Sequence, residues 1–261
     1  MKIIKFFLIS LISTVLNIEI LLADTKKGTK FVLLGHLYPL IKNHEGGLLK
    51  LAEKVNSHNP DYIFILGDLF NTWLGDDVSI KSYKAIISSL KQLTKQTKVF
   101  VMVGNRDFLL SRKFEAATDC KIIKEPYELN HNSKKYLLIH GDSLCTDDIN
   151  YQKLKKVLRN PIIKFIFLNL PKSARLKLTG QLRKRSIEAQ SYKAVKIMDV
   201  NQLAVNNLME KYQGFDLIHG HTHMQNTHSM DSYTRYVLGD WSSNKGNAIK
   251  LSEDLEWLEF N

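Results

Sequence analysis

Four short polar motifs carry the side chains most suited to chemistry in this 261-residue chain. They are Gly67-Asp68, Gly104-Asn105-Arg106-Asp107, His140-Gly141-Asp142 and His219-Gly220-His221-Thr222-His223. Each motif directly follows a hydrophobic run that has the composition of a β-strand. In open α/β sheets the ligand crevice lies beyond the carboxyl ends of the strands. We therefore expect these side chains to converge at one edge of a sheet.

The donor types in these motifs indicate a metal centre. A carboxylate, an amide oxygen and several imidazoles suit borderline-hard divalent ions such as Mn²⁺ better than ions that prefer thiolates. Two such ions about 3.5–4 Å apart can bind both the attacking and the leaving oxygen of a phosphoryl displacement. Asp68 has the character of a bridging carboxylate. Any one of these motifs alone is more typical of an ordinary loop, so the prediction of a two-metal phosphoesterase rests on all four together.

The elements that must position these motifs alternate along the chain. Beyond Lys30, short β-branched or aromatic runs alternate with longer helical patterns, which predicts an α/β sandwich. The expected strands are Phe31–Leu34, Tyr62–Leu66, Val99–Val103, Tyr136–Ile139, Leu217–Ile218, Tyr236–Leu238, Ala248–Leu251 and Trp257–Phe260. The expected helices repeat apolar residues at spacings of three and four, and they are Leu48–Ser57, Lys81–Lys95 and Asp199–Tyr212. Asp199 is the expected N-cap of the last helix.

The segment from Asn150 to Lys196 interrupts this alternation. It has the pattern of consecutive amphipathic helices broken at Pro161 and Pro171, with no strand between His140 and Leu217. We interpret it as a helical cap, at about residues 150–196, inserted into one domain of residues 30–261. Its basic residues alternate with apolar positions, which suits a membrane-facing surface; the alternative is a set of ordinary core helices with solvated basic faces. These basic residues are Lys155, Lys156, Arg159, Lys164, Lys172, Arg175, Lys177, Arg183, Lys184 and Arg185.

Composition excludes several classes of protein. A hydrophobic content of 44% supports a full core and argues against disorder. Cys120 and Cys145 occur neither in a CxxC pair nor beside histidines at zinc-ligand spacing, which argues against a disulfide framework and a thiolate metal site. The net charge of +11 favours an anionic partner. The placement of the charge favours an anionic membrane surface and a phosphorylated substrate over nucleic acid.

Residues 1–23 resemble a secretory signal peptide. Lys2 and Lys5 precede the apolar run Phe6–Leu16, and the segment ends in Leu21-Leu22-Ala23, but Glu19 interrupts its apolar part. Two interpretations stay open for residues 1–29: a signal or anchor, or an extension with no exporting role. The segment is too short and too interrupted to predict a membrane span.

From about Phe31 to Phe260 the chain resembles the calcineurin-like metallophosphoesterases. It is most similar to the branch that hydrolyses UDP-2,3-diacylglucosamine in lipid A biosynthesis. The likeness rests on Tyr62–Phe70, Trp73–Asp77, Gly104–Leu110, His140–Asp148 and Ile197–Gln202. Arg106 stands where generic members of the family carry histidine, which points to this branch.

The resemblance implies a β-sandwich flanked by helices, with a helical cap and two Mn²⁺ ions. The implied reaction cleaves the pyrophosphate of UDP-2,3-diacylglucosamine into UMP and 2,3-diacylglucosamine 1-phosphate (lipid X). The implied place of action is the cytoplasmic face of the bacterial inner membrane, where the protein would be peripheral. Export or anchoring is the alternative if residues 1–23 act as a signal.

The resemblance also assigns roles to individual residues. Asp68 would bridge the ions, Asn105, His140 and His221 would bind one of them, and His223 would bind the other. The implied catalytic residues are Asp68, Asn105, Arg106 and His140, with Arg106 neutralising phosphate charge. The implied substrate-binding residues are Asn105, Arg106, Asp148, Ser186, Gln190, Lys193 and His221. Gln190 stands where the family usually has asparagine, which keeps the amide.

The first metal-binding motif departs from the family pattern. Members of the family end their first strand with Asp-x-His, but this chain reads Leu33-Leu34-Gly35-His36-Leu37-Tyr38. An alignment without a gap places the Asp and His positions on Gly35 and Leu37, whereas a shift of one residue places them on Leu34 and His36. Either alignment removes a carboxylate from one ion. His44 and Glu45 are nearby substitutes, although solvated loop residues are the simpler interpretation.

The missing aspartate keeps two other functions open. Loss of an outer-shell partner alone typically costs 10–100-fold in metal affinity or activity, and loss of a direct ligand should cost at least as much. The chain could therefore be a catalytically impaired homologue that binds lipid or membrane through its cap. A broader phosphodiester hydrolase is the third hypothesis, and it predicts turnover of substrates without acyl chains.

Overall fold

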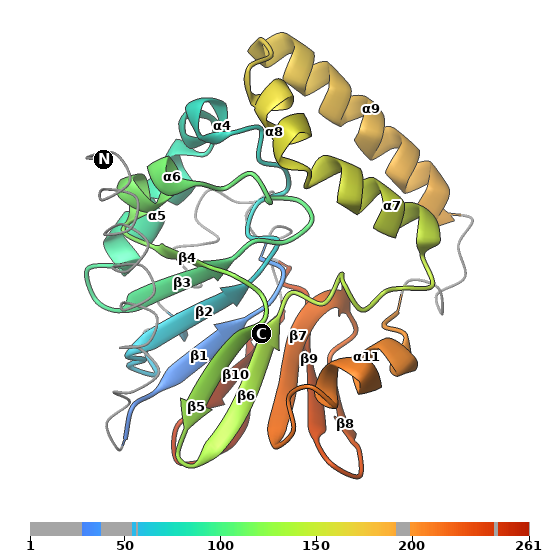
Figure 1. Cartoon of the computed structure of the whole chain (residues 1–261). Coiled ribbons are helices and arrows are strands. Elements are labelled where there is room, and N and C mark those ends of the chain that lie inside the picture. Colours follow the sequence, from blue (N-terminus) through green and yellow to red (C-terminus); the bar gives the residue numbers. More distant parts are fainter. Residues whose placement is uncertain (1–27, 38–53, 56, 192–198, 243–244, 261) are drawn as a thin grey trace, which may run out of the picture.

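The computed structural model describes residues 28–37, 54–55, 57–191, 199–242 and 245–260 (Figure 1). The leader at residues 1–23 and most of the expected helix Leu48–Ser57 lie outside the described residues. Among the described residues, the structure has no helix that is long and apolar enough to cross a membrane.

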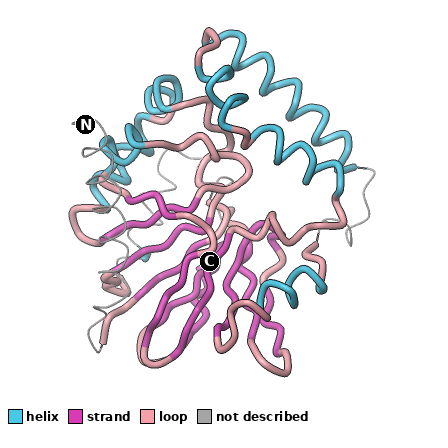
Figure 2. Tube along the Cα trace, viewed as in Figure 1, coloured by secondary structure: helices cyan, strands magenta, loops and turns pink. Residues whose placement is uncertain are grey.

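Two β-sheets form the centre of the fold. The six-stranded sheet has the order β11-β10-β1-β2-β3-β4, and the five-stranded sheet has the order β5-β6-β7-β9-β8. The first contains β1 (Phe31–Leu34), β2 (Tyr62–Leu66), β3 (Lys98–Met102), β4 (Lys121–Ile123), β10 (Gly246–Leu251) and β11 (Leu255–Phe260). The second contains β5 (Tyr127–His131), β6 (Lys134–Ile139), β7 (Phe215–His223), β8 (Asn226–Ser229) and β9 (Thr234–Gly239). This arrangement, flanked by helices, confirms the predicted α/β sandwich (Figure 2).

The alternation of side chains in β1 explains how the sheets pack. Phe31 and Leu33 point into a core that lies between the sheets, where they meet residues of the second sheet such as Ile218. Val32 and Leu34 point to the other face, where a second core is covered by helices. Successive side chains of a strand point to opposite faces. A strand buried on both faces therefore needs the continuous apolar run that this sequence has.

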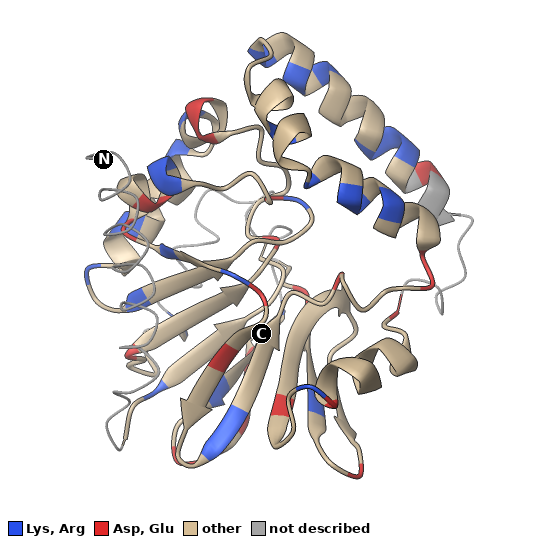
Figure 3. Cartoon of the chain, in the orientation of Figure 1, with Lys and Arg blue, Asp and Glu red and all other residues tan. Residues whose placement is uncertain are grey.

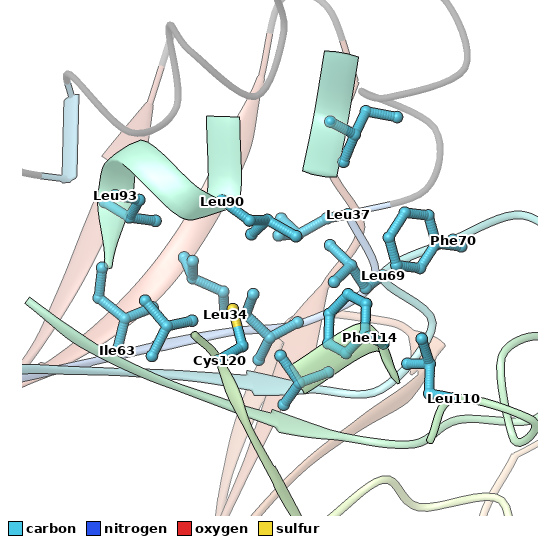
Figure 4. Packing of buried hydrophobic residues seen from close by; sticks show 14 of the residues in the cluster. Leu34, Leu37, Ile63, Leu69, Phe70, Leu90, Leu93, Leu110, Phe114 and Cys120 are labelled. Carbon is cyan, nitrogen blue, oxygen red and sulfur yellow. The ribbon is translucent and has the colours of Figure 1, made fainter. Parts of the chain in front are cut away.

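Helices cover the outer faces of both sheets. α4 (Asp76–Ser82), α5 (Lys84–Leu93) and α6 (Arg112–Thr118) lie over the first sheet, where Leu90 and Phe114 pack with strand residues such as Leu34 and Ile63 (Figure 4). α11 (Gln202–Met209) covers the second sheet through Val205.

Parallel pairing directs the critical loops to one edge. β1, β2 and β3 are parallel neighbours in the first sheet, and β6, β7 and β9 are parallel neighbours in the second. Their carboxyl ends therefore share an edge of the sandwich, as the sequence predicts for its four motifs.

Three consecutive helices lie over this edge (Figure 1). They are α7 (Ile149–Leu158), α8 (Pro161–Leu168) and α9 (Lys172–Ser191). The breaks at Pro161 and Pro171 are confirmed. Asn160 caps α8 by accepting the Ile162 amide at 2.9 Å, and proline in the first turn suits a helix start because its missing N–H would have no helical partner.

The structure corrects two of the expected helices. The segment Lys81–Lys95 is not continuous: α4 ends at Ser82 and α5 begins at Lys84. Tyr83 lies between them, where its ring stacks on Trp73 and its hydroxyl donates to the Thr72 carbonyl at 3.1 Å. The expected N-cap Asp199 is wrong, because Asn201 accepts the Ala204 amide at 3.1 Å and caps α11.

Candidate metal centre

Asp68 contacts several of the polar side chains at the carboxyl ends of the strands. It follows β2 through Gly67, and its side chain is buried. The Arg106 amide donates to Asp68 Oδ1 at 2.9 Å, and His36 Nδ1 lies 3.3 Å from Oδ2. His140 Nε2 and Arg106 Nε lie 3.9 Å and 3.5 Å from the same Oδ2. The Asp68 carboxylate, after β2, thus contacts groups that follow β1, β3 and β6.

Two glycines make this close approach possible. A Cβ on Gly67 would lie 2.3 Å from His140 Nδ1, and a Cβ on Gly104 would lie 2.2 Å from Asp68 Oδ1. Gly67 also has φ +90°, a conformation that favours glycine. The glycines of the first two motifs therefore keep space for the neighbouring donors.

Asn105, His140 and His221 form a group on one side of Asp68. Asn105 Oδ1 lies 3.1 Å from His140 Nε2 and 3.1 Å from His221 Nδ1. One ligand atom each from Asp68, His140 and His221 lies within 4.8 Å of the others. The sequence predicts this grouping, and the structure brings these residues together.

The hydrogen bonds of His140 show how a cation could bind here. His140 Nδ1 lies 2.9 Å from the Leu66 carbonyl, so Nδ1 carries a proton and donates it. Burial acts to lower the pKa of His140, but the neighbouring carboxylates of Asp68 and Asp142 outweigh it and raise the pKa. A proton on Nε2 is donated to the Asn105 amide oxygen at 3.1 Å. A divalent cation beside the Asp68 carboxylate would replace that proton and leave the Nε2 lone pair for the metal.

His36 and His223 form a second group beside Asp68. Their ring centroids are 3.6 Å apart, and His36 contacts Asp68 as described above. His221 and His223 have φ values of 67° and 61°, and the pairing of β7 with β9 shifts register between His219 and His223. This irregularity lets two alternate residues of one strand reach the two groups.

The structure decides between the two alignments of the first motif. Leu37 and Leu34 are buried in the hydrophobic core, and His36 lies at the metal centre. Gly35 faces the other sheet, because a Cβ there would lie 2.9 Å from Leu238 Cβ and 3.2 Å from the Gly239 carbonyl. Of the two alignments, the shifted one places a histidine, His36, beside Asp68, and neither residue 34 nor residue 35 supplies a carboxylate. His44 and Glu45 lie outside the described residues.

Electrostatics keep Asp68, His221 and His223 in the forms that metals bind. Burial acts to raise the pKa of Asp68, but the neighbouring His140 and the contact with His36 outweigh it and hold the pKa below its ordinary value. Burial lowers the pKa of His221 to about 3 and that of His223 to about 4. At neutral pH, Asp68 is therefore ionised and both histidines offer lone pairs.

Arg106 lies beside Asp68, and part of its side chain is exposed to solvent. Its Nη1 donates to Asn71 Oδ1 at 3.3 Å, and its side chain is 29% exposed. Its guanidinium is thereby held beside Asp68 while part of it stays accessible. Such a planar cation can bind phosphate oxygens through several N–H groups.

Several supporting residues fit no metal-ligand pattern in the sequence and were not predicted. Asp107 accepts the Gly104 amide at 2.7 Å and the Phe70 amide at 3.2 Å, which ties two loops together. Burial and the nearby Asp68 raise the pKa of Asp107 to about 7. The Glu125 carboxylate accepts the His140 amide at 2.9 Å. His36 was absent from the expected ligands, although its position directly after β1 was the available signal.

Asp142 connects the centre to the cap. Its carboxylate accepts the Tyr151 hydroxyl at 2.6 Å, and it pairs with Lys155 Nζ at 2.9 Å and Arg159 Nη2 at 3.3 Å. The Tyr151 ring stacks on His221 at 6.2 Å between centroids. α7 is therefore fixed directly to the loop that carries His140.

The structure describes only some of the expected substrate-binding side chains. Asp148 caps α7 by accepting the Tyr151 amide at 3.1 Å, and Ser186 is exposed on α9. Gln190 belongs to α9, but its side chain lies outside the described residues, as does all of Lys193. The structure thus places Asp148 at the start of α7 and Ser186, exposed, on the long helix α9.

Comparisons with known proteins agree with this geometry. A family model described as calcineurin-like phosphoesterase matches residues 20–225. A UDP-2,3-diacylglucosamine hydrolase of Shigella dysenteriae is 37% identical over 210 residues, which are 78% of this chain and 87% of that protein. Proteins with the same name in Serratia proteamaculans and Histophilus somni are 37% and 39% identical over 82% and 69% of this chain. The matched regions are 91% and 78% of those two proteins.

Proposed function

Because the chain belongs to the calcineurin-like phosphoesterase family, we propose that it hydrolyses the pyrophosphate bond of UDP-2,3-diacylglucosamine to UMP and 2,3-diacylglucosamine 1-phosphate. The observation that carries the proposal is a buried carboxylate, Asp68, that has metal-ligand spacing with His140 and His221 and also contacts His36. The names of the relatives support the choice of substrate. Arg106, in place of the more usual histidine, supports the same branch.

Among the described residues, Asp68, His140 and His221 have metal-ligand spacing, and we propose a second ion beside His36 and His223. Asp68, Asn105, His140 and His221 would hold one ion, and Asp68, His36 and His223 would hold the other. Nitrogen and oxygen donors without thiolates favour Mn²⁺. When bound, such ions generate a nucleophile at neutral pH and neutralise charge on the phosphoryl oxygens.

The residues of the chain position the diphosphate relative to these donors. Asp68 is fixed by the Arg106 amide and by the contacts with His36 and His140. The guanidinium of Arg106 is partly exposed beside this carboxylate, so it can bind a phosphate oxygen as negative charge grows. Asp148 stands at the start of α7 and is proposed to contact the head of the substrate, together with Ser186, Gln190 and Lys193 of the cap.

The cap has the surface chemistry for the acyl chains and the membrane. Its helix α8 exposes Ile162, Phe165 and Ile166 to 69%, 70% and 52%. Lysines and arginines lie along α7 and α9 on either side in the sequence (Figure 3). We propose that the apolar residues shelter acyl chains and that the basic residues meet the anionic inner-membrane surface from the cytoplasmic side.

Release of UMP from the acylated substrate tests the proposal. Purified protein with Mn²⁺ should release UMP, chelation should abolish the reaction, and Asp68→Asn should reduce the rate by at least about 100-fold, since removal of the shared ligand affects both ions. Asp254→Asn is a control, because that carboxylate is exposed and lies near Lys134 instead. Absence of release from fully loaded protein would contradict the proposal.

A second candidate function follows from the first motif. Because residues 34 and 35 supply no carboxylate, the chain could bind lipid through its cap without turnover. Strong binding to acylated lipid, with at most one metal ion per chain and no UMP, would favour this candidate. Comparable rates on UDP-glucosamine without acyl chains would instead favour a broader hydrolase.

A further inference from the structure

Arg175, near the start of α9, belongs to the cap residues whose basic pattern predicts a membrane-facing surface, but it is only 4% exposed. Its Nη1 donates to the Leu74 carbonyl at 2.7 Å and to Asp77 Oδ1 at 2.9 Å, and its Nη2 donates to Asp77 Oδ2 at 2.5 Å. A guanidinium with these contacts inside the protein cannot meet lipid headgroups. The prediction is therefore wrong for this residue, and Arg175 attaches the cap to the start of α4 instead.

We propose that Arg175 is a positioning residue that holds the outer end of the cap, meaning α8 and the start of α9, and so sets the affinity for the acylated substrate. This inference rests on the proposed function, because it concerns the acyl chains of that substrate. In this role Arg175 acts through Leu74 and Asp77, without a contact to substrate or metal.

The segment that receives Arg175 is fixed to the loop of Arg106. The Trp73 amide donates to the Arg106 carbonyl at 3.1 Å. The Trp73 indole donates to Asp76 Oδ1 at 2.8 Å, and the other oxygen of Asp76 accepts the Ser111 hydroxyl at 2.6 Å. Trp73 and Asp76 are both buried. Arg175 therefore binds a stretch of chain whose place relative to Arg106 is set by buried hydrogen bonds.

Both helices of the outer end approach the backbone at Gly75. Gly75 has φ +109°, and a Cβ there would lie 2.7 Å from Leu168 Cδ2 and 2.8 Å from Arg175 Nη1. Leu168 is the last residue of α8, and Lys164 of the same helix donates to the Phe108 carbonyl at 3.2 Å. Glycine leaves room for the two side chains at this point. α8 and α9 thus pack on the same turn that Arg175 binds.

The cap has a separate attachment at its inner end, α7. There Asp142 pairs with Lys155 and Arg159. The apolar surface that is proposed to shelter acyl chains lies on α8, between the two attachments. Loss of the Arg175 contacts should therefore release α8, while α7 and the metal centre stay in place. The affinity for acyl chains and the chemistry at the metal centre should then respond separately.

Arg175→Met tests the inference, and Lys250→Met is its matched control. Each substitution removes the cation of an ion pair whose carboxylate is 52% exposed, Asp77 in one case and Glu256 in the other. In Arg175→Met we expect amide hydrogen exchange of α8 to accelerate by about 10-fold or more and that of α7 to stay unchanged, because the loss of charged hydrogen bonds favours local opening. KM for UDP-2,3-diacylglucosamine should rise by about 10-fold, while kcat and the Mn²⁺ content keep their wild-type values. Lys250→Met should change none of these quantities.

Two further variants keep the inference falsifiable. Arg175→Lys retains the charge but lacks the planar fork that contacts both oxygens of Asp77, so its KM should lie between those of the wild type and Arg175→Met. Asp77→Asn alters the half-exposed partner and should reproduce the effect if Arg175→Met does not fold. Wild-type exchange and KM in Arg175→Met, or in Asp77→Asn where the first variant is unfolded, would overturn the inference. A change in kcat or Mn²⁺ content in place of KM would overturn it as well.

Binding of the lipid product separates the inference from the proposed function. The affinity for 2,3-diacylglucosamine 1-phosphate needs no turnover, and calorimetric titration with Mn²⁺ present should show it weakened by about 10-fold in Arg175→Met and unchanged in Lys250→Met. If this holds but wild-type protein releases no UMP, the role of Arg175 stands and the proposed function falls. If UMP is released but both variants bind the product equally, the proposed function stands and the role of Arg175 falls.

Discussion

Backbone conformation, as much as residue type, places the donors of this centre. His36, Asp68, His221 and His223 all have positive φ values, between 27° and 67°. Residues in such conformations cost of order 1–3 kcal/mol each and persist where the surrounding structure imposes them. In β7 the result is that His221 and His223 reach different groups around Asp68.

The close packing of the backbone around Asp68 can be tested at Gly104. In Gly104→Ala the new Cβ would lie 2.2 Å from Asp68 Oδ1 and 2.5 Å from the Asp68 amide nitrogen. Because one of these contacts is with backbone, Asp68 must move. We expect at least about a 10-fold loss of metal affinity and a matching loss of UMP release, both measured on purified protein.

Gly180→Ala is the matched control. Gly180 lies in α9, and a Cβ there meets nothing within 4 Å. Alanine should leave metal binding unchanged and stabilise the helix by roughly 0.5–1 kcal/mol. Equal metal affinity in Gly104→Ala and Gly180→Ala would show that Asp68 tolerates the displacement.

The proposed metal ligands could be predicted from the sequence where they lie in recognisable motifs. The residues that support these ligands through hydrogen bonds and ion pairs could not. Asp68, Asn105 and His140 follow strands, and His221 and His223 lie at the carboxyl end of β7, so their convergence at one edge could be expected. Asp142 and Glu125 act by binding α7 and the His140 amide, which only the folded chain reveals. The missing aspartate also left the alignment of His36 open until the packing of Leu37 fixed it.

At the scale of elements, α7 connects the cap to the metal centre. Arg159 donates to the Gly104 carbonyl at 3.3 Å and pairs with Asp142 and with Glu125. Gly104 and Asp142 belong to the loops that hold Asn105 and His140, and Glu125, between β4 and β5, accepts the His140 amide. The helix therefore supports the positions of two proposed ligands without touching an ion itself.

Removal of the guanidinium should disturb this support. In Arg159→Met the buried Asp142 carboxylate loses one cationic partner, which costs roughly 1–3 kcal/mol. We expect a lower melting temperature and a kcat/KM for UMP release reduced by about 10-fold or more. Lys156→Met changes an exposed cation of the same helix and should alter neither quantity. Identical kinetics for the two variants would contradict a positioning role for Arg159.

Elements buried on both faces were the easiest to predict. β1, β2 and β3 have continuous apolar runs, and their predicted bounds agree with the structure within one residue. The short strands β4, β5 and β8 were missed, because three to five residues with polar members carry little periodic signal. The break between α4 and α5 was missed because Tyr83 continues the apolar pattern while its ring packs on Trp73.

At the scale of the whole molecule, buried histidines make stability depend on pH. His219 is fully buried, its Nδ1 donates to the Gly220 carbonyl at 2.9 Å, and Arg235 faces its other nitrogen at 3.4 Å. Burial lowers its pKa from 6.5 to about 3. Between these values the unfolded chain binds a proton that the folded chain does not, so acid favours unfolding.

The free energy of unfolding of chelated protein should therefore fall as the pH is lowered from about 6.5 toward 4. The loss from one such group approaches about 1.4 kcal/mol per pH unit. Denaturant unfolding at several pH values would measure it. His219→Gln cannot titrate, so its slope should be smaller by about one proton. An unchanged slope in that variant would show that His219 does not contribute.

The distribution of apolar and basic side chains over the cap predicts how the molecule meets a surface. Phe165 on α8 is 70% exposed, and replacing it with aspartate places a negative charge among Ile162 and Ile166. We expect Phe165→Asp to reduce sedimentation with vesicles that contain anionic phospholipid, because it loses apolar contact and repels the headgroups. Leu203→Asp is the matched control, since Leu203 is 68% exposed on α11, away from the cap (Figure 1).

Binding should also weaken as salt rises, because exposed charges are screened within about 10 Å at 0.1 M. If the two variants bind vesicles equally, or if binding does not change with salt concentration, the cap is not the part of the molecule that contacts the membrane.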